Sequence, residues 1–275
     1  MRILYPEGKT KALTFSYDDN QIHDRRLVEI FNRYGLYGTF HLNASKISIN
    51  NSAEGFVTLE ECEKLYKGHE ISCHGLNHPF LGQLSKGKLL NELLEDKRQL
   101  EKIFKYPIRG MSYPFGEYSA AVITAAESVG MEYARTVGAT RGFGWPRNFM
   151  EWHPTCHHND LLRNKELVDG FINLPSYIDL PLFYIWGHSY EFADDNTWEE
   201  MELLCQQLSG REDVWYGTNI QVKDYICAVR GLVFSTDQTM IYNPSAITIY
   251  IEDNSILHSL LPGETLYLLN SHMAD

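Results

Sequence analysis

Two adjacent carboxylates and three histidines carry most of the chemistry that this sequence offers. Asp18 and Asp19 end an apolar stretch, His74 and His78 lie four residues apart, and His188 follows another apolar run. Carboxylate and imidazole groups are the ligands that zinc and similar divalent metals take in proteins. Two histidines and one of the two aspartates would leave open coordination positions for water and substrate. The other aspartate would then face the water, and His188, with an ordinary pKa near ~6.5, would donate a proton.

Each of these motifs also has an ordinary structural explanation. The pair Asp18-Asp19 can be a solvated turn or a helix cap, and His188 can be a buried histidine bonded to the backbone. Two loop histidines can stand near each other by chance in a chain with eleven of them. The run Cys156-His157-His158 could also bind a metal, but we favour a plain loop there.

The elements that must position these residues follow a repeated order of strand, loop and helix. The expected strands span residues 11–17, 37–43, 69–73, 108–113, 131–137, 149–157, 180–187 and 214–218. The expected helices span residues 21–34, 58–68, 85–104, 119–129, 161–174, 197–208 and 219–228. Short strands at 233–234, 247–251 and 265–269 are expected in the tail.

This order predicts an α/β fold, a distorted TIM-like (β/α) barrel of seven or eight units over residues 1–230, with a small β extension over residues 231–275. The reactive side chains all fall where an expected strand ends. In such barrels the carboxyl ends of the strands form the face on which sites are built. This placement favours function over chance for the motifs above.

Composition limits the partners of the chain. A formal charge of −12 argues against a nucleic-acid partner or an anionic membrane surface and favours a neutral sugar or a small amide as substrate. No segment is long and apolar enough for a signal peptide or a membrane span, so we expect a cytoplasmic protein unless a leader has been removed. The five scattered cysteines predict free thiols. The sequence carries no signal about oligomeric state.

Four motifs in this order resemble the polysaccharide deacetylase (NodB-homology, carbohydrate esterase) family over roughly residues 10–225. They are Ser16-Tyr17-Asp18-Asp19, His74-Gly75-Leu76-Asn77-His78-Pro79, Tyr113-Pro114-Phe115-Gly116 and Trp186-Gly187-His188. Any one of them is weak, but the four in order are specific. The resemblance implies a distorted barrel and a divalent metal, with zinc as the first choice and cobalt or nickel as alternatives.

The resemblance also implies roles for individual residues. Asp18 would be the catalytic base and His188 the general acid, and Asp19, His74 and His78 would be the metal ligands. The Phe115 backbone N–H would contribute to the oxyanion hole. Tyr113 and Trp186 are further candidates for contact with the substrate.

The sequence departs from the family pattern at two places. Ser112 stands where many members have an arginine that tethers the catalytic aspartate, and Arg109, three residues earlier, should lie on the opposite face of the strand. The family's Asp-Trp motif, which orients the acidic histidine, is not evident. Trp152, His157 and Asp160 are candidates for that role.

The expected function is therefore a metal-dependent hydrolase that removes acetyl groups from N-acetylated, or alternatively O-acetylated, carbohydrate. The first alternative is an amidase that uses the same site on a small non-sugar amide or imide. The second is a carbohydrate-binding pseudoenzyme, in which Trp145, Trp152, Trp186 and Trp215 would offer stacking surfaces, although core packing is the commoner role of tryptophan.

Overall fold

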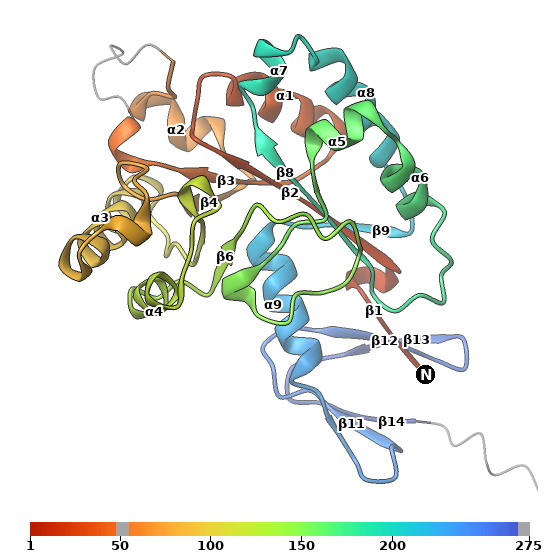
Figure 1. The fold of residues 1–275 in the computed structure, drawn as a ribbon. Helices are drawn as coiled ribbons and strands as arrows, with labels where there is room; N and C mark the ends of the chain where they lie inside the picture. Colours follow the sequence, from red (N-terminus) through yellow and green to blue (C-terminus); the bar gives the residue numbers. More distant parts are fainter. Residues whose placement is uncertain (48–54, 269–275) are drawn as a thin grey trace, which may run out of the picture.

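The computed structural model describes residues 1–47 and 55–268 (Figure 1). Its strands are β1 (Arg2–Leu4), β2 (Lys11–Asp18), β3 (Gly38–Leu42), β4 (Glu70–Cys73), β5 (Gly110–Ser112), β6 (Tyr133–Arg135), β7 (Cys156–His157), β8 (Leu182–His188), β9 (Val214–Tyr216), β10 (Val233–Phe234), β11 (Met240–Tyr242), β12 (Ile249–Asp253), β13 (Ile256–Leu260) and β14 (Thr265–Tyr267). The parallel sheet at its centre runs in the order β6-β5-β4-β3-β2-β8-β7, and β9 pairs with the start of β2. This curled sheet confirms the predicted α/β barrel.

Helices cover the outside of this sheet (Figure 1). The α-helices are α1 (Asp24–Tyr34), α2 (Leu59–Leu65), α3 (Lys86–Phe104), α4 (Ala120–Ser128), α5 (His158–Arg163), α6 (Glu166–Ile172), α7 (Glu191–Asp194), α8 (Trp198–Leu208) and α9 (Asn219–Arg230). Short 3₁₀ turns are η1 (Pro6–Gly8), η2 (Ala44–Lys46), η3 (Leu81–Gln83), η4 (Pro114–Gly116) and η5 (Phe149–Glu151). Helices α2, α3 and α4 are neighbours on one side of the barrel, and α1, α8, α5 and α6 are neighbours on the other.

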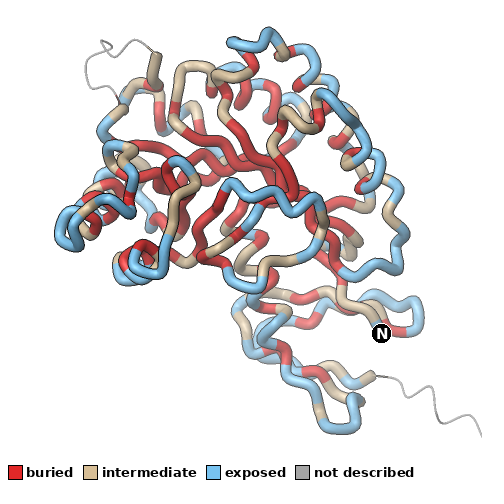
Figure 2. The backbone as a smooth tube through the Cα atoms, in the orientation of Figure 1, coloured by how far each residue is buried: buried red, intermediate tan, exposed pale blue. Residues whose placement is uncertain are grey.

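The core lies between the sheet and these helices. Every residue of β2 is buried, as expected for a central parallel strand covered on both faces (Figure 2). Helix α1 turns its apolar side to the sheet and ends at Gly35, whose φ of 64° is the left-handed conformation that glycine adopts easily. Thr58 and Glu61 form a capping box at the start of α2. Burial of both faces of β2 therefore fixes the position of this strand and of its carboxyl end.

The barrel is closed irregularly between β6 and β7. The backbone at Trp152 donates a hydrogen bond to the Ala134 carbonyl and accepts one from the Thr136 N–H. Most of the strand expected over 149–157 is not formed, and only the two residues of β7 pair with β8. The 3₁₀ turn η5 takes its place after Asn148, whose side chain accepts a hydrogen bond from the Met150 N–H. Side chain–backbone bonds of this kind compete with strand pairing.

Two expected elements differ in extent from the structure. The helix expected over 161–174 is two helices, α5 and α6, because Asn164 has an extended backbone and its side chain accepts from the Glu166 N–H. Helix α7 was not expected from the sequence, since its four residues are too few to show a helical period.

The tail contains more strands than the hairpin or three strands expected. Strands β10, β11 and β14 form one antiparallel sheet, and β12 and β13 form another together with β1. The N-terminal strand therefore packs with the tail, and the division at residue 230 stays a prediction. The last residue of the strand expected over 265–269 lies outside the described residues.

Among the described residues, no helix has both the length and the apolar character needed to cross a bilayer.

Candidate active site

Asp18 and Asp19 lie at the carboxyl end of β2, where the chain leaves the sheet. Asp18 is the last strand residue and its side chain is buried. Asp19 has a φ of 80°, a conformation that asparagine and aspartate tolerate better than most residues. This change of backbone direction gives the two carboxylates different hydrogen-bond partners, although both lie near His74 Nε2, at 3.6 Å for Asp18 and 4.0 Å for Asp19.

His74 and His78 lie in the loop after β4, and helix α3 holds that loop. Asp96 accepts a hydrogen bond from the His74 backbone N–H at 3.0 Å. Glu92 accepts from both the backbone N–H and the side-chain amide of Asn77, at 2.5 and 3.0 Å. Both carboxylates are buried on the face of α3 that packs against the loop. A helix in the barrel wall therefore fixes the spacing of the two histidines.

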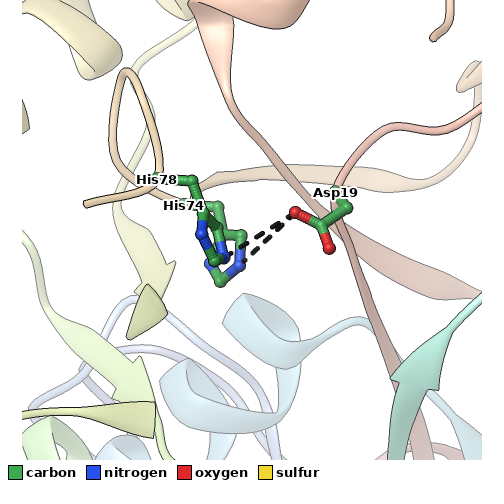
Figure 3. A group of neighbouring side chains, drawn as sticks. All are labelled: Asp19, His74 and His78. Atoms are coloured by element: carbon green, nitrogen blue, oxygen red, sulfur yellow. Dashed lines mark ion pairs between the residues drawn. The ribbon is translucent and has the colours of Figure 1, made fainter. Parts of the chain in front are cut away.

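Asp19, His74 and His78 come together as the sequence predicts (Figure 3). Each offers one ligand atom, and these atoms lie within 4.8 Å of one another. The Nε2 atoms of His74 and His78 are 4.0 and 3.8 Å from Asp19 Oδ1. Two ligand atoms of a tetrahedral zinc site with bonds of about 2.0–2.1 Å are separated by roughly 3.3 Å, so a small contraction of the group would suit a cation.

The protonation of His74 also suits a metal. Its Nδ1 lies 3.1 Å from the Ser112 carbonyl oxygen, which can only accept, so Nδ1 carries the proton and Nε2 has a free lone pair. Burial lowers the pKa of His74 to about 4, which keeps the ring neutral at pH 7. A neutral imidazole whose other nitrogen donates to a carbonyl is the usual form of a ligating histidine. The residues present therefore fit a divalent metal. A cationic side chain also contacts the group, since Lys46 Nζ lies 3.3 Å from Asp19 Oδ1.

Asp18 is anchored by two partners that the sequence did not assign to it. Arg135, at the end of β6, donates from Nη2 to Asp18 Oδ2, and Ser112 Oγ donates to Asp18 Oδ1 at 3.1 Å. Burial alone would raise the pKa of Asp18, but the charge of Arg135 outweighs it and holds that pKa well below its usual range. Ser112 Oγ also lies 2.7 Å from His74 Nδ1, so one hydroxyl joins the candidate base to the candidate ligand.

His188 is the register partner of Asp18 on the adjacent strand β8. Its Nδ1 lies 2.8 Å from Oε1 of Glu191, the first residue of α7. Burial opposes the charged imidazolium, but the hydrogen bond to Glu191 and the charge of Asp18 outweigh it and raise the pKa of His188 above its ordinary value. Because Nδ1 is held by Glu191, Nε2 is the atom that can give a proton to a substrate.

Phe115 borders the metal-ligand group. It lies in η4 with a φ of 59°, and its ring contacts His78 edge-on with centroids 4.4 Å apart. The same ring is stacked on Phe80 at 3.9 Å, and both rings are largely exposed. Positive φ at a bulky residue is a strained conformation that is concentrated at functional sites.

Trp186 and Tyr113 have different environments. The Trp186 ring lies against Arg135 and His157, and its buried Nε1–H has no hydrogen-bond partner among the described residues. A buried donor without a partner is rare and is satisfied when a ligand offers an acceptor. Tyr113 is buried, and its hydroxyl donates to the Met150 carbonyl at 2.8 Å. The structure therefore places the Trp186 ring against the Arg135 guanidinium, whereas Tyr113 meets Arg135 through a backbone hydrogen bond from its N–H to the Arg135 carbonyl.

Within the part of the chain that the structure describes, none of the candidates for orienting His188 forms a hydrogen bond with it. Trp152 is buried in a separate cluster, and Asp160 lies at the surface with its nearest cation, Arg141, 4.0 Å away. The ring of His157 is 6.2 Å from that of His188, and Glu191 lies between them in the network. Arg109 pairs with Glu132 and Asp224 and does not reach Asp18, as the strand geometry predicts.

Comparison with known proteins bears on the barrel. The family model described as polysaccharide deacetylase matches residues 5–134, which include both aspartates and both predicted ligand histidines. These residues belong to the polysaccharide deacetylase family. A peptidoglycan-N-acetylglucosamine deacetylase from Bacillus cereus is 27% identical over 124 residues, which are 45% of this chain and 54% of that protein. The chain thus spans about half the length of the curated relative that it matches.

Solved structures share the barrel. A polysaccharide deacetylase family structure from Mycobacterium smegmatis has a TM-score of 0.60 at 15% identity and covers 84% of this chain and 95% of its own. A pseudoenzyme of carbohydrate esterase family 4 from Bacillus anthracis has a TM-score of 0.51 at 17% identity and covers 80% of this chain and 67% of its own. At these identities the similarity establishes the fold of the deacetylase barrel.

Proposed function

We propose that the chain is a hydrolase that removes acetyl groups from N-acetylated carbohydrate with the help of a divalent metal, zinc as first choice. The observation that supports this most directly is the position of Asp18. It is buried and ionised beside Arg135, and it directly precedes Asp19 in the two-histidine, one-carboxylate group. A cation held by Asp19, His74 and His78 would supply Lewis acidity, which polarises a carbonyl and acidifies water.

Asp18 would accept the proton of the attacking water. A carboxylate whose pKa is held low is a weak base, so it can act only where the site makes that water acidic. Arg135 and Ser112 keep the carboxylate ionised and in one orientation. The low pKa therefore suits a base that works next to a cation and returns its proton easily.

His188 would protonate the departing amine. An amide leaves poorly unless its nitrogen receives a proton, and the raised pKa of His188 keeps the imidazolium available at neutral pH. Glu191 fixes the ring by accepting from Nδ1, which leaves Nε2 as the donor. The Phe115 N–H and the Trp186 Nε1–H are the neutral donors proposed for the acetyl carbonyl oxygen, which becomes the oxyanion of the tetrahedral intermediate. One such donor contributes on the order of 3 kcal/mol in well-studied hydrolases.

The decisive experiment is an acetate-release screen on chitin, peptidoglycan and xylan fragments, with and without added zinc or cobalt. We expect metal-dependent release from an N-acetylated fragment. Release from xylan alone would assign O-deacetylation. Hydrolysis of a small amide or imide without acetate release from any fragment would assign the amidase alternative.

A pseudoenzyme is disfavoured by two observations. The pseudoenzyme alternative was motivated by the absence of the family's arginine at position 112, but Arg135 supplies a guanidinium to Asp18 from another strand. Moreover, the four tryptophans proposed as stacking surfaces are buried or packed at the edge of a core, two of them around Tyr5. Carbohydrate binding by itself requires neither the paired Asp18 nor the two ligand histidines.

A further inference from the structure

A second group of metal-binding side chains lies beside His188. His157 on β7, His158 on α5 and Glu191 on α7 each offer one ligand atom, and these atoms lie within 4.8 Å of one another. The Nε2 atoms of His157 and His158 are 3.2 and 3.0 Å from Glu191 Oε2. The sequence favours a plain loop at these histidines, and it is helix α7 that brings the carboxylate to them.

His158 is the most constrained member of this group. It is fully buried between the rings of Tyr17 and Phe192, and within residues 1–47 and 55–268 neither of its ring nitrogens has a hydrogen-bond partner. Although Nε2 is only 3.0 Å from Glu191, the contact is too poorly directed to be a hydrogen bond. A buried imidazole whose nitrogens lack hydrogen-bond partners is suited to a metal.

Gly187 makes room for this imidazole. A Cβ atom at position 187 would come within 1.9 Å of His158 Nδ1, so any other residue would displace the ring. This close approach gives a physical reason for the glycine between Trp186 and His188. The strand that presents His188 to the active site is thus also shaped to hold His158 near Glu191.

We propose that His157, His158 and Glu191 form a second divalent-cation site, separate from the group of Asp19, His74 and His78. Two imidazoles and a carboxylate are ligands suited to zinc, cobalt or nickel. Glu191 Oε2 faces both histidines and would supply the carboxylate ligand. The formal charge of −12 on the chain also favours cations. This inference does not depend on the deacetylase proposal.

The second site should be weaker than the first. His157 Nδ1 accepts a hydrogen bond from the Asn159 backbone N–H at 3.2 Å. Ligation through Nε2 requires a proton on Nδ1, which removes that bond at the start of α5. Glu191 is shared, because its Oε1 holds His188 while its Oε2 faces the two histidines. A cation bound at Oε2 would offset the negative charge of Glu191, which stabilises the protonated form of His188. Excess metal should therefore inhibit any activity that needs the His188 proton.

Metal stoichiometry tests the proposal without relying on activity. Chelator-treated protein is dialysed against Zn²⁺ at several concentrations, and bound zinc is measured by elemental analysis. We expect two zinc ions per wild-type chain, one in the variant His74→Ala/His78→Ala and one in His157→Ala/Glu191→Gln. The variant with all four substitutions should bind none. The zinc retained by His74→Ala/His78→Ala should need at least tenfold more free metal.

Each other outcome has a defined meaning. No zinc in a folded His74→Ala/His78→Ala variant, or zinc retained by the fourfold variant, overturns the second site. One zinc per wild-type chain that is lost only with His157 and Glu191 supports the second site and contradicts the first. Circular dichroism checks the fold of each variant. If the His74→Ala/His78→Ala variant unfolds, the His157→Ala/Glu191→Gln variant decides. A folded His157→Ala/Glu191→Gln chain that binds as much zinc as the wild type at saturation overturns the proposal.

Discussion

Arg135, at the end of β6, donates a hydrogen bond to Asp18, at the end of β2, and both side chains are buried. The family pattern places a tethering arginine at position 112, where this chain has serine. Here the guanidinium comes from the next strand instead, and it also lies over the Trp186 ring with its centre 4.3 Å from the ring centroid. The candidate base is therefore anchored although the usual position of the anchor is different.

Replacement of Arg135 by methionine should destabilise the protein and reduce turnover. The change leaves a buried carboxylate without its counter-charge, which costs about 3–5 kcal/mol in the free energy of unfolding. It also frees Asp18 to move, and a displaced catalytic group loses on the order of 10²-fold in rate. Urea unfolding and acetate release measure the two effects.

A double-mutant cycle gives the control for this prediction. Because Asp18→Asn removes the buried charge, Arg135→Met should cost less in the Asp18→Asn background than in the wild type. Equal costs in both backgrounds would show that Arg135 stabilises the fold by packing and not by its pairing with Asp18.

Position 112 should not accept the family's arginine. Ser112→Arg would bury a second guanidinium next to Arg135 and remove the hydroxyl that joins Asp18 to His74, so we expect a loss of several kcal/mol in stability. Ser112→Ala should cost about 1–3 kcal/mol, because it removes one hydrogen bond from the Asp18 carboxylate. Thermal unfolding compares the two. A Ser112→Arg protein that is as stable and active as the wild type would contradict the assigned role of Arg135.

The sequence predicted the barrel and the close approach of Asp19, His74 and His78, because both depend on local patterns. That these three side chains bind a metal stays a prediction. Strand ends and helix stops place Asp19, His74 and His78 at one edge of the sheet. Arg135 was not assigned, although a lone arginine in the strand Tyr133–Arg135 was a visible signal. Its partner is 117 residues away in the chain, so only the pairing of strands shows which carboxylate it meets.

Glu191 illustrates a second limit. It begins a helix of four residues, which is too short to predict from sequence. It contacts His188, three positions earlier, and also His157 and His158, which lie more than thirty positions earlier. The candidates chosen from sequence for its role were Trp152, His157 and Asp160, of which Trp152 and Asp160 have the residue types of the family motif. Residue type alone could not show that they point elsewhere.

Glu191→Gln should move the basic limb of the pH dependence of kcat/KM to lower pH. His188 must be protonated to act as an acid, and its activity is lost as pH rises through its pKa. The Glu191 carboxylate raises that pKa, so removing the charge lowers it and the loss of activity begins at lower pH. The exposed Glu199→Gln, on α8, is the matched control for net charge. An unshifted basic limb in Glu191→Gln would exclude His188 as the titrating acid.

Phe115→Ala should weaken substrate binding more than turnover. The exposed ring beside His78 offers a flat surface to a sugar, whereas the backbone N–H proposed for the oxyanion is retained. Loss of an aromatic contact of about 0.5–1.5 kcal/mol corresponds to roughly a two- to tenfold rise in KM. Phe80→Ala is the companion variant, since it leaves Phe115 in place. A large fall in kcat with unchanged KM in Phe115→Ala would assign the ring a role other than binding.

The most direct test of the account is a comparison of wild type and Asp18→Asn at matched metal content, with acetate release from N-acetylglucosamine oligomers as the measurement. The substitution keeps the shape of the side chain and the donor set of Asp19, His74 and His78. We predict that Asp18→Asn binds the same amount of metal as the wild type and releases acetate about 10²–10⁴-fold more slowly. Full activity of Asp18→Asn with the wild-type metal content would contradict the assignment of Asp18 as the base.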